Sequence, residues 1–401
     1  MDPDIRALEA DLRHLAAIDR PSASAGELEA AEWIREALTA AGADAVIEEE
    51  AAHGTYWWPN GLLNVLGGAA GLAALRGHRA TGVLVGAAAA AGVADDVSGG
   101  PLWFRRRFLP HRPTWNVVAE AGDRTARETL VLVAHHDAAR TGLIFHPGVP
   151  EWIGERFPGL IERSQTSPPV IWLVFGGPAI VALGSLLGHR GLIRAGTGLA
   201  FGAAATLAQV GASSTVPGAN DNLTGVATLL GVARGLDDDP VAGVRVVLVS
   251  TGSEESFMEG MRGFVARHAT RLAPDRTRFL CIDTVGSPFL TAPECEGMLI
   301  HRDYDGELKD LLSTCAAEQD IGLGRGLRLS FATDGLISLL AGYRTALLAS
   351  VTRNKAPANY HWPTDDADNV DYARVGDAVR LCDGLIRRLA DPAERPAAAP
   401  A

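Results

Sequence analysis

Residues 128–137 read ETLVLVAHHD, an apolar run that ends on two histidines and an aspartate. A short, continuous apolar run is typical of a strand buried on both faces of a parallel sheet. Residues just past the C-terminal ends of such strands face the ligand crevice of an α/β fold. Side chains alternate along a strand, so His135 and Asp137 point to one side and His136 to the other. The stretch therefore predicts an α/β fold with its chemistry at His135 and Asp137.

Two later runs have the same form, and each is followed by carboxylates. Residues 244–250 precede Glu254 and Glu255, and residues 278–282 precede Asp283. Because parallel strands end at one edge of a sheet, these three carboxylates are expected in the same crevice. Each motif alone is common on protein surfaces, so it is their occurrence together that indicates a functional site.

Two loops complete a candidate ligand set. Gly-Ala-Asn-Asp-Asn at 218–222 opens a pattern of helical apolar spacing at 223–236, which places Asp221 at a loop-to-helix junction. Tyr-His-Trp-Pro at 360–363 supplies His361, so the set holds two imidazoles and three carboxylates, with a spare carboxylate beside them. Three carboxylates and a bridging hydroxide offset the charge of two divalent ions, so two ions suit these residue types better than one.

The order of these motifs resembles that of the M28 family of zinc aminopeptidases and carboxypeptidases. The motifs are His-x-Asp, Gly-Ala-Asn-Asp-Asn, Glu-Glu, Asp-Thr-Val-Gly and His-x-Pro-x-Asp, in this order. Arg20-Pro-Ser-Ala-Ser with Glu27, and Trp115-Asn-Val-Val-Ala-Glu, look like the opening elements of that family. The resemblance implies an α/β/α sandwich with a mostly parallel central sheet. It covers about residues 5–55, 113–138 and 216–391.

The resemblance also implies a role for each candidate residue. One metal would be bound by His135 and Asp283, the other by Glu255 and His361, with Asp221 bridging the two. Glu254 would be the general base, acting with a hydroxide held between the metals. Asp137 would orient the His135 imidazole or a nearby backbone group, and Asp365 would do the same for His361. The implied cofactors are two zinc ions, because the family uses zinc; the residue types themselves do not select the metal.

Two apolar insertions interrupt the catalytic segments. The uncharged runs at 56–75 and 80–94 flank a basic turn, and those at 167–187 and 195–220 flank a second one. Each pair predicts a helical hairpin with a basic tip, and the two hairpins are expected to join into one inserted subdomain. The predicted parts are a catalytic domain at 1–55, 113–138 and 216–391, hairpin insertions at 56–112 and 139–215, and a disordered tail at 392–401.

The apolar runs allow two interpretations. A run of about 20 apolar residues can span a bilayer core; three of the four runs reach the lower limit, and 80–94 falls short. The many Gly and Ala residues permit close helix contact in a membrane but also suit a packed soluble subdomain. Tryptophans such as Trp58 and Trp172 lie near the ends of the runs, as interfacial anchors do. We therefore expect membrane association through residues 56–94 and 167–215, with a water-soluble helical cap as the alternative.

Charge, cysteine content and the first residues of the chain argue against nucleic-acid-binding, disulfide-rich and secreted proteins. The formal net charge of -12 argues against a nucleic-acid partner. The four cysteines have no Cys-x-x-Cys spacing and imply no disulfide framework. The start, Met1-Asp-Pro-Asp-Ile-Arg, lacks a basic segment followed by an apolar one, so no secretory signal is expected. The catalytic domain is accordingly expected on the cytoplasmic side of a membrane.

The expected activity is hydrolysis of peptide bonds by a two-zinc exopeptidase, first of all an aminopeptidase. A carboxypeptidase is the nearest alternative, because Arg353 and Lys355 could hold a substrate carboxylate. Glutaminyl-peptide cyclases share the fold and most of the ligands, so the motifs alone do not exclude them. A non-catalytic membrane scaffold is a further alternative, although such a protein need not keep five ligands and Glu254. A catalytic mouth beside a bilayer would favour peptides or N-acyl amino acids that partition into lipid.

Overall fold

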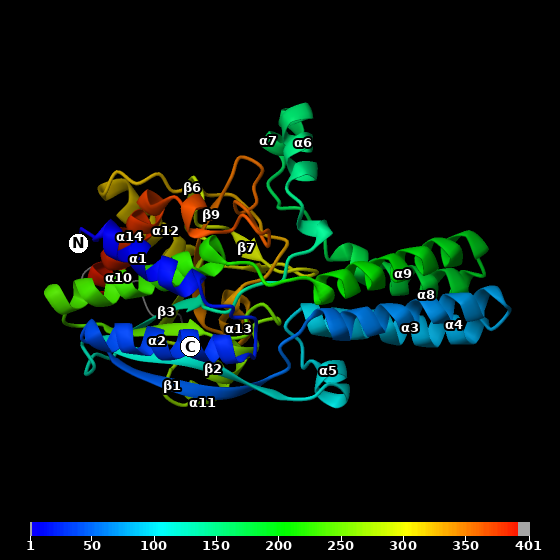
Figure 1. Ribbon diagram of the computed structural model, residues 1–401, viewed down its shortest axis with the longest axis horizontal. Helices are drawn as coiled ribbons and strands as arrows, with labels where there is room; N and C mark the ends of the chain where they lie inside the picture. Colours follow the sequence, from blue (N-terminus) through cyan, green and yellow to red (C-terminus); the bar gives the residue numbers. More distant parts are fainter. Residues whose placement is uncertain (1, 392–401) are drawn as a thin grey trace.

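The computed structural model describes residues 2–391 and contains a seven-stranded sheet (Figure 1). The strands lie in the order β1-β2-β4-β3-β5-β9-β6. Their bounds are β1 Asp44–Ala52, β2 Arg112–Gly122, β3 Thr129–His135, β4 Arg245–Thr251, β5 Thr277–Asp283, β6 Phe289–Thr291 and β9 Arg344–Val351. Strands β4, β3, β5 and β9 are parallel, while β1, β2 and β6 pair antiparallel at the two edges. The predicted, mostly parallel central sheet is confirmed.

The three predicted strands form the centre of this sheet. The runs expected at 128–134, 244–250 and 278–282 correspond to β3, β4 and β5 to within one residue at each end. All residues of β3 and β5 are buried. Alternate residues of β3 enter two separate cores: Leu130 and Leu132 pack into one, Val131 and Val133 into the other. A continuous apolar run is what a strand covered on both faces requires.

Helices cover both faces of the sheet. The helices of the catalytic domain are α1 (Ile5–Ala16), α2 (Ala25–Ala40), α10 (Thr224–Asp238), α11 (Glu259–His268), α12 (Gly306–Glu318), α13 (Asp334–Leu340) and α14 (Tyr372–Ala390). Helices α1, α2, α10, α12 and α14 contribute to the core on one face, and α11 and α13 to the core on the other. The expected α/β/α sandwich is therefore present. A ribbon of β7 (Cys295–Glu296) and β8 (Arg302–Asp303), and a short turn η3 (Ala367–Asn369), complete the domain.

Both insertions contribute to one four-helix bundle, called the arm below, which projects from one side of the catalytic domain (Figure 1). Its helices are α3 (Trp57–Leu75), α4 (Arg79–Val97), α8 (Trp172–Leu187) and α9 (Arg190–Ala212). Arg79 donates to the carbonyl oxygens of Ser185 and Leu186, and Arg190 donates to that of Leu75. Each basic tip thus caps a helix C-terminus of the other hairpin. The elements that link the arm to the domain are α5 (Trp103–Phe108), η1 (Leu143–Phe145), α6 (Gly148–Arg156) and α7 (Pro158–Arg163).

The helix lengths in the arm correct the lengths expected from the apolar runs. Helix α4 has 19 residues because it includes Arg79 and continues through Asp95 to Val97, so the expectation that residues 80–94 fall short of a span is wrong. Helix α8 has only 16 residues, because residues 167–171, which include Pro168 and Pro169, lie outside the helix. Among residues 2–391, α4 and α9 are the two helices long and apolar enough to cross a membrane by length and composition.

A buried ion-pair network ties the base of the arm to the catalytic domain. Arg105 of α5 pairs with Asp96 of α4 at 2.7 Å and donates to the carbonyl oxygen of Ser256 at 2.5 Å. Glu259 Oε2 lies 3.4 Å from Arg105 Nη1, and Asn60 of α3 donates to Asp96 at 2.7 Å. Arg105 and Asp96 are almost fully buried. The network fixes the arm beside the loop that follows β4.

Candidate metal centre

The predicted ligands and the predicted base lie together at the C-terminal edge of the parallel strands. His135 is the last residue of β3, and Asp283 is the last residue of β5. Asp221 lies in the turn η2 (Ala219–Leu223) before α10. Glu254 and Glu255 lie in the loop after β4, and His361 lies in the loop after β9. All six residues are buried. Segments far apart in the sequence thus supply one compact cluster of titratable side chains.

Asp221 stands between the two imidazoles. Its Oδ1 lies 3.2 Å from His135 Nε2, and its Oδ2 lies 3.2 Å from His361 Nε2. Asp283 Oδ2 lies 4.0 Å from His135 Nε2, and Glu255 Oε2 lies 3.3 Å from His361 Nε2. His135, Asp221 and Asp283 form one group, and Asp221, Glu255 and His361 form another, with ligand atoms within 4.8 Å of one another in each. The geometry offers two candidate ion positions that share Asp221.

The charges of the cluster indicate that it suits cations. Burial and the neighbouring Asp221 raise the pKa of Asp283 to about 8. Burial also raises the pKa of Glu254 well above its usual range. For His361, burial would lower the pKa, but Glu255 and Asp221 outweigh it and raise the pKa to about 10. Glu255 Oε1 is buried without a hydrogen-bond partner among the described residues. Crowded carboxylates with imidazoles, offering oxygen and nitrogen donors, fit zinc and similar divalent ions.

Asp137 lies behind this cluster and holds three of its members. Its Oδ1 accepts from the backbone N–H of Glu254 at 3.0 Å, and its Oδ2 accepts from the N–H of Glu255 at 3.1 Å and from the hydroxyl of Ser22 at 2.6 Å. The same carboxylate lies 3.4 Å from His135 Nδ1. Both roles that the sequence left open, orienting the imidazole and orienting a backbone group, are therefore available to Asp137. His136, in contrast, points away and contacts the hydroxyl of Ser250.

Asp365 has a different partner from the one expected. Its Oδ1 and Oδ2 accept from the backbone N–H groups of Asn220 and Asp221, at 2.7 Å and 3.2 Å. The Nδ1 atom of His361 is buried without a hydrogen-bond partner among the described residues. The expectation that Asp365 orients His361 is therefore wrong. Asp365 instead fixes the turn that presents Asp221, since that turn leaves its amide hydrogens without helical partners.

Two further buried carboxylates support the site and carried little signal in the sequence. Glu27 accepts hydrogen bonds from the backbone N–H of Ser253 at 3.0 Å and from the hydroxyl of Thr114 at 2.6 Å. These bonds fix the start of the loop that carries Glu254 and Glu255. Burial raises the pKa of Glu27 to about 8. Asp334 begins α13 and accepts from the hydroxyl of Thr251, at the end of β4. In the sequence, Glu27 is visible only as part of a flanking motif, and Asp334 reads as an ordinary helix start.

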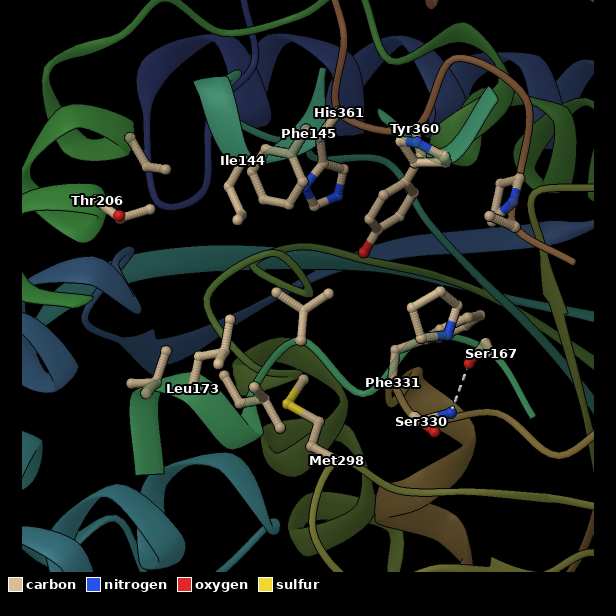
Figure 2. Close-up of a pocket in the computed structure, with 18 of the residues that line it drawn as sticks. Ile144, Phe145, Ser167, Leu173, Thr206, Met298, Ser330, Phe331, Tyr360 and His361 are labelled. Carbon is tan, nitrogen blue, oxygen red and sulfur yellow. Dashed lines mark hydrogen bonds between the residues drawn. The ribbon is translucent and has the colours of Figure 1, made fainter. Parts of the chain in front are cut away.

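Aromatic rings from the catalytic domain and from the second insertion enclose His361. The ring of Tyr360 stacks on that of His361 with centroids 3.9 Å apart, and Phe145 of η1 meets it edge-on at 4.6 Å. Figure 2 shows these three side chains together on one wall of a cavity. The cavity has a volume of about 1310 Å³ and also has Glu254 and Glu255 in its lining. The cluster therefore opens onto a space large enough for a substrate.

A comparison with protein families agrees with this geometry. The profile described as Peptidase family M28 matches residues 206–385, which contain Asp221, Glu255, Asp283 and His361. The resemblance to M28 peptidases is confirmed. No curated protein sequence matches the chain.

Solved structures of an aminopeptidase, an exopeptidase and a glutaminyl cyclase share the fold. An aminopeptidase from Aneurinibacillus sp. strain AM-1 is 12% identical with a TM-score of 0.55, over 96% of this chain and 94% of that one. A Zn-dependent exopeptidase from Parabacteroides distasonis is 12% identical with a TM-score of 0.55, over 97% and 99%. A glutaminyl cyclase from Bacteroides thetaiotaomicron is 10% identical with a TM-score of 0.55, over 96% and 98%. At such identities the likeness shows the fold and leaves the reaction open.

Proposed function

We propose that this chain is a two-metal exopeptidase and that it acts first of all as an aminopeptidase. The observation that carries the proposal is Asp221, whose two oxygens each lie 3.2 Å from an imidazole nitrogen, of His135 and of His361. A carboxylate in that position is suited to bridge two ions. The M28 match and the Zn-dependent exopeptidase among the similar structures support zinc as the metal.

The residues of the cluster divide the chemistry among them. A pair of bound divalent ions would acidify a water molecule and polarise the scissile carbonyl. Glu254 lines the cavity beside both candidate ion positions, with its Oε2 3.9 Å from His135 Nε2. It would take a proton from the water and pass it to the leaving amine. The hydroxyl of the water then joins the acyl carbon as the carbon–nitrogen bond breaks, so one water is consumed for each amide cleaved.

Asp137 would keep the base in place during this transfer. It accepts hydrogen bonds from the backbone of Glu254 and of Glu255, so the side chain that moves the proton and the side chain that binds metal share one support. Rigid support of this kind keeps reacting groups in their productive geometry.

Peptides with free and with blocked amino termini test the proposal. Zinc-loaded protein that cleaves free peptides and spares N-blocked ones is an aminopeptidase, and a chelator should abolish the activity. Cleavage that requires a free carboxyl terminus would instead favour a carboxypeptidase, for which Arg353 lines the cavity, while Lys355 already donates to the carbonyl oxygen of Ser164. Pyroglutamate formed from a glutamine-initiated peptide without bond cleavage would favour a cyclase. No metal after reconstitution would refute the two-metal centre.

We also propose that the arm holds the protein in a membrane. Its surface exposes large apolar side chains, among them Leu84 (71% exposed), Leu186 (64%) and Leu187 (64%). Soluble monomers rarely leave apolar surface of this kind in contact with water. A cytoplasmic position of the catalytic domain stays a prediction, which protease accessibility in sealed vesicles would test.

A further inference from the structure

The cavity at the candidate metal centre continues far into the arm. Its lining runs from Glu254 and His361 to a stripe on helix α9 that extends from Arg194 to Val210. Every fourth residue of α9 belongs to the stripe, so it follows one side of the helix. At 1.5 Å per residue the stripe is about 24 Å long. The cavity therefore extends along α9 as an open groove, called the channel below, which is much longer than one amino-acid side chain.

Small residues of α9 make up part of this side of the channel, next to Leu199 and Leu207. At Gly198 and Gly202 of α9, an added Cβ would meet no atom within 4 Å, so both positions border open space. Figure 2 shows Leu173 and Met298 on the wall across the cavity from Phe145. The small residues of α9 and the large apolar residues on the other walls form a lining that suits a slender apolar group.

The α9 side of the channel offers almost no hydrogen bonds. Between Arg194 and Val210, the residues of the stripe are apolar except Thr206. The Thr206 hydroxyl already donates to the carbonyl oxygen of Gly202 in the same helix. A peptide backbone lying along this stripe would leave its amide hydrogens and carbonyl oxygens unpaired, which is unfavourable. A hydrocarbon chain has no such groups and is stabilised by leaving water. The α9 side of the channel therefore favours a hydrocarbon chain over an extended peptide.

We propose that the substrate is an amide that carries a long unbranched hydrocarbon chain, and that this chain lies along α9 while the amide reaches Glu254. The proposal rests on the amide hydrolysis proposed above. The chain could belong to the acyl part, as in an N-acyl amino acid, or to the amine part, as in an amino acid alkylamide. Glu151 and Arg353 also line the cavity, so either the ammonium or the carboxylate of such a head group has a partner of opposite charge.

Two substrate series distinguish these sources. Zinc-loaded protein is assayed with N-acyl glycines from acetyl to hexadecanoyl, and with leucine amides of alkylamines of the same lengths. We expect kcat/KM to rise by up to about fourfold per methylene in one series, as burial of apolar surface predicts, until the channel is filled. The series that shows the rise identifies the side of the amide that carries the chain.

A variant that narrows the channel ties the effect to α9. Gly202→Leu places a side chain in open space inside a helix, where leucine is a better helix former than glycine, so the variant should fold. It should lose at least tenfold in kcat/KM on the longest substrates and keep wild-type activity on the shortest. Gly306→Leu is the matched control, because its Cβ also enters open space but lies at the start of α12, away from the arm. The control should behave as wild type on all substrates.

A binding measurement provides a readout that does not depend on catalysis. Hexadecanoate competes with a fluorescent fatty acid for the protein, with all variants measured in the same detergent. Binding that Gly202→Leu weakens tenfold, with the control unchanged, supports the channel even if no hydrolysis is found; in that case it is the proposed function that fails. Hydrolysis of short amides with no gain from chain length in either series would overturn the inference and leave the proposed function standing. Equal binding to wild type and Gly202→Leu would overturn it as well.

Discussion

At the scale of single residues, the adjacent glutamates at 254 and 255 have different surroundings. Glu255 Oε2 lies 3.3 Å from His361 Nε2 and belongs to the group that includes Asp221. Glu254 Oε2 lies 3.9 Å from His135 Nε2. A third group, made of His135 and both glutamates, is also within ligand distance, so geometry alone permits Glu254 to bind metal. Substitution at the two positions separates the role of ligand from the role of base.

We predict that Glu254→Gln leaves the metal content close to wild type and lowers kcat at least about a hundredfold, since glutamine cannot accept the proton of the water. Glu255→Ala should cost both metal and activity, because it removes a ligand of one candidate position. Elemental analysis and kcat on a peptide substrate, measured on the same samples, check both outcomes. Near-normal turnover of Glu254→Gln would show that another group is the base.

At the scale of elements, the strands and their terminal ligands were predictable, while contacts between distant elements were not. Strand β3 is a continuous apolar run because both of its faces are covered, and that pattern is visible in the sequence. The end of α4 was missed because Asp95 and Asp96 read as a break, whereas Asp96 is buried against Arg105. Nothing in the spacing indicated that Phe145, from an insertion, would pack on the ring of His361. Such contacts depend on how elements dock, which local periodicity does not encode.

The packing of α8 on α9 predicts different effects for two adjacent glycines. A Cβ at Gly177 would lie 2.6 Å from the backbone nitrogen of Ala200, whereas a Cβ at Gly176 would meet its nearest atom, from Leu199, at 3.5 Å. Gly177→Ala should therefore destabilise the arm by about 1–3 kcal/mol through overpacking. Gly176→Ala, in the same helix, should be neutral or stabilise by up to about 1 kcal/mol. Thermal unfolding of the two variants and wild type tests this, and equal midpoints would contradict the close helix contact.

The network at the base of the arm predicts a pH-dependent stability. Burial would raise the pKa of Glu259, but Arg105 and His53 outweigh it and lower the pKa to about 2 from 4.5. A carboxyl with a depressed pKa stabilises the fold above its unfolded value and loses that effect as the pH falls toward its folded value. Glu259→Gln should thus cost about 3–5 kcal/mol near neutral pH, as expected for breaking a buried ion pair. The difference in unfolding free energy from wild type should shrink below pH 4.5, and a constant difference would contradict the assignment.

At the scale of the whole molecule, the arm and the catalytic domain line one cavity. The arm helix α9 forms a side of the same cavity that contains Glu254 and His361. The buried pair of Arg105 and Asp96 fixes the arm to the loop after β4, which carries the glutamates. A substrate that enters along α9 would therefore reach the candidate metal centre without leaving an apolar surface. This arrangement is physically consistent with a substrate delivered from a lipid phase.

We predict that the arm holds the protein in a membrane, because it exposes large leucines and because α4 and α9 are long and apolar enough to cross a bilayer. The protein should sediment with membranes, resist extraction by salt or alkaline carbonate, and dissolve in detergent. Leu84→Lys places a charge on an arm side chain that is 71% exposed and should lower recovery in the membrane fraction, because a lysine within a span costs about 2.5–3.5 kcal/mol. Ile300→Lys, at a position 60% exposed on the catalytic domain, is the control and should leave recovery unchanged. Wild-type protein recovered monodisperse from the soluble fraction without detergent would instead establish the arm as a water-soluble helical cap.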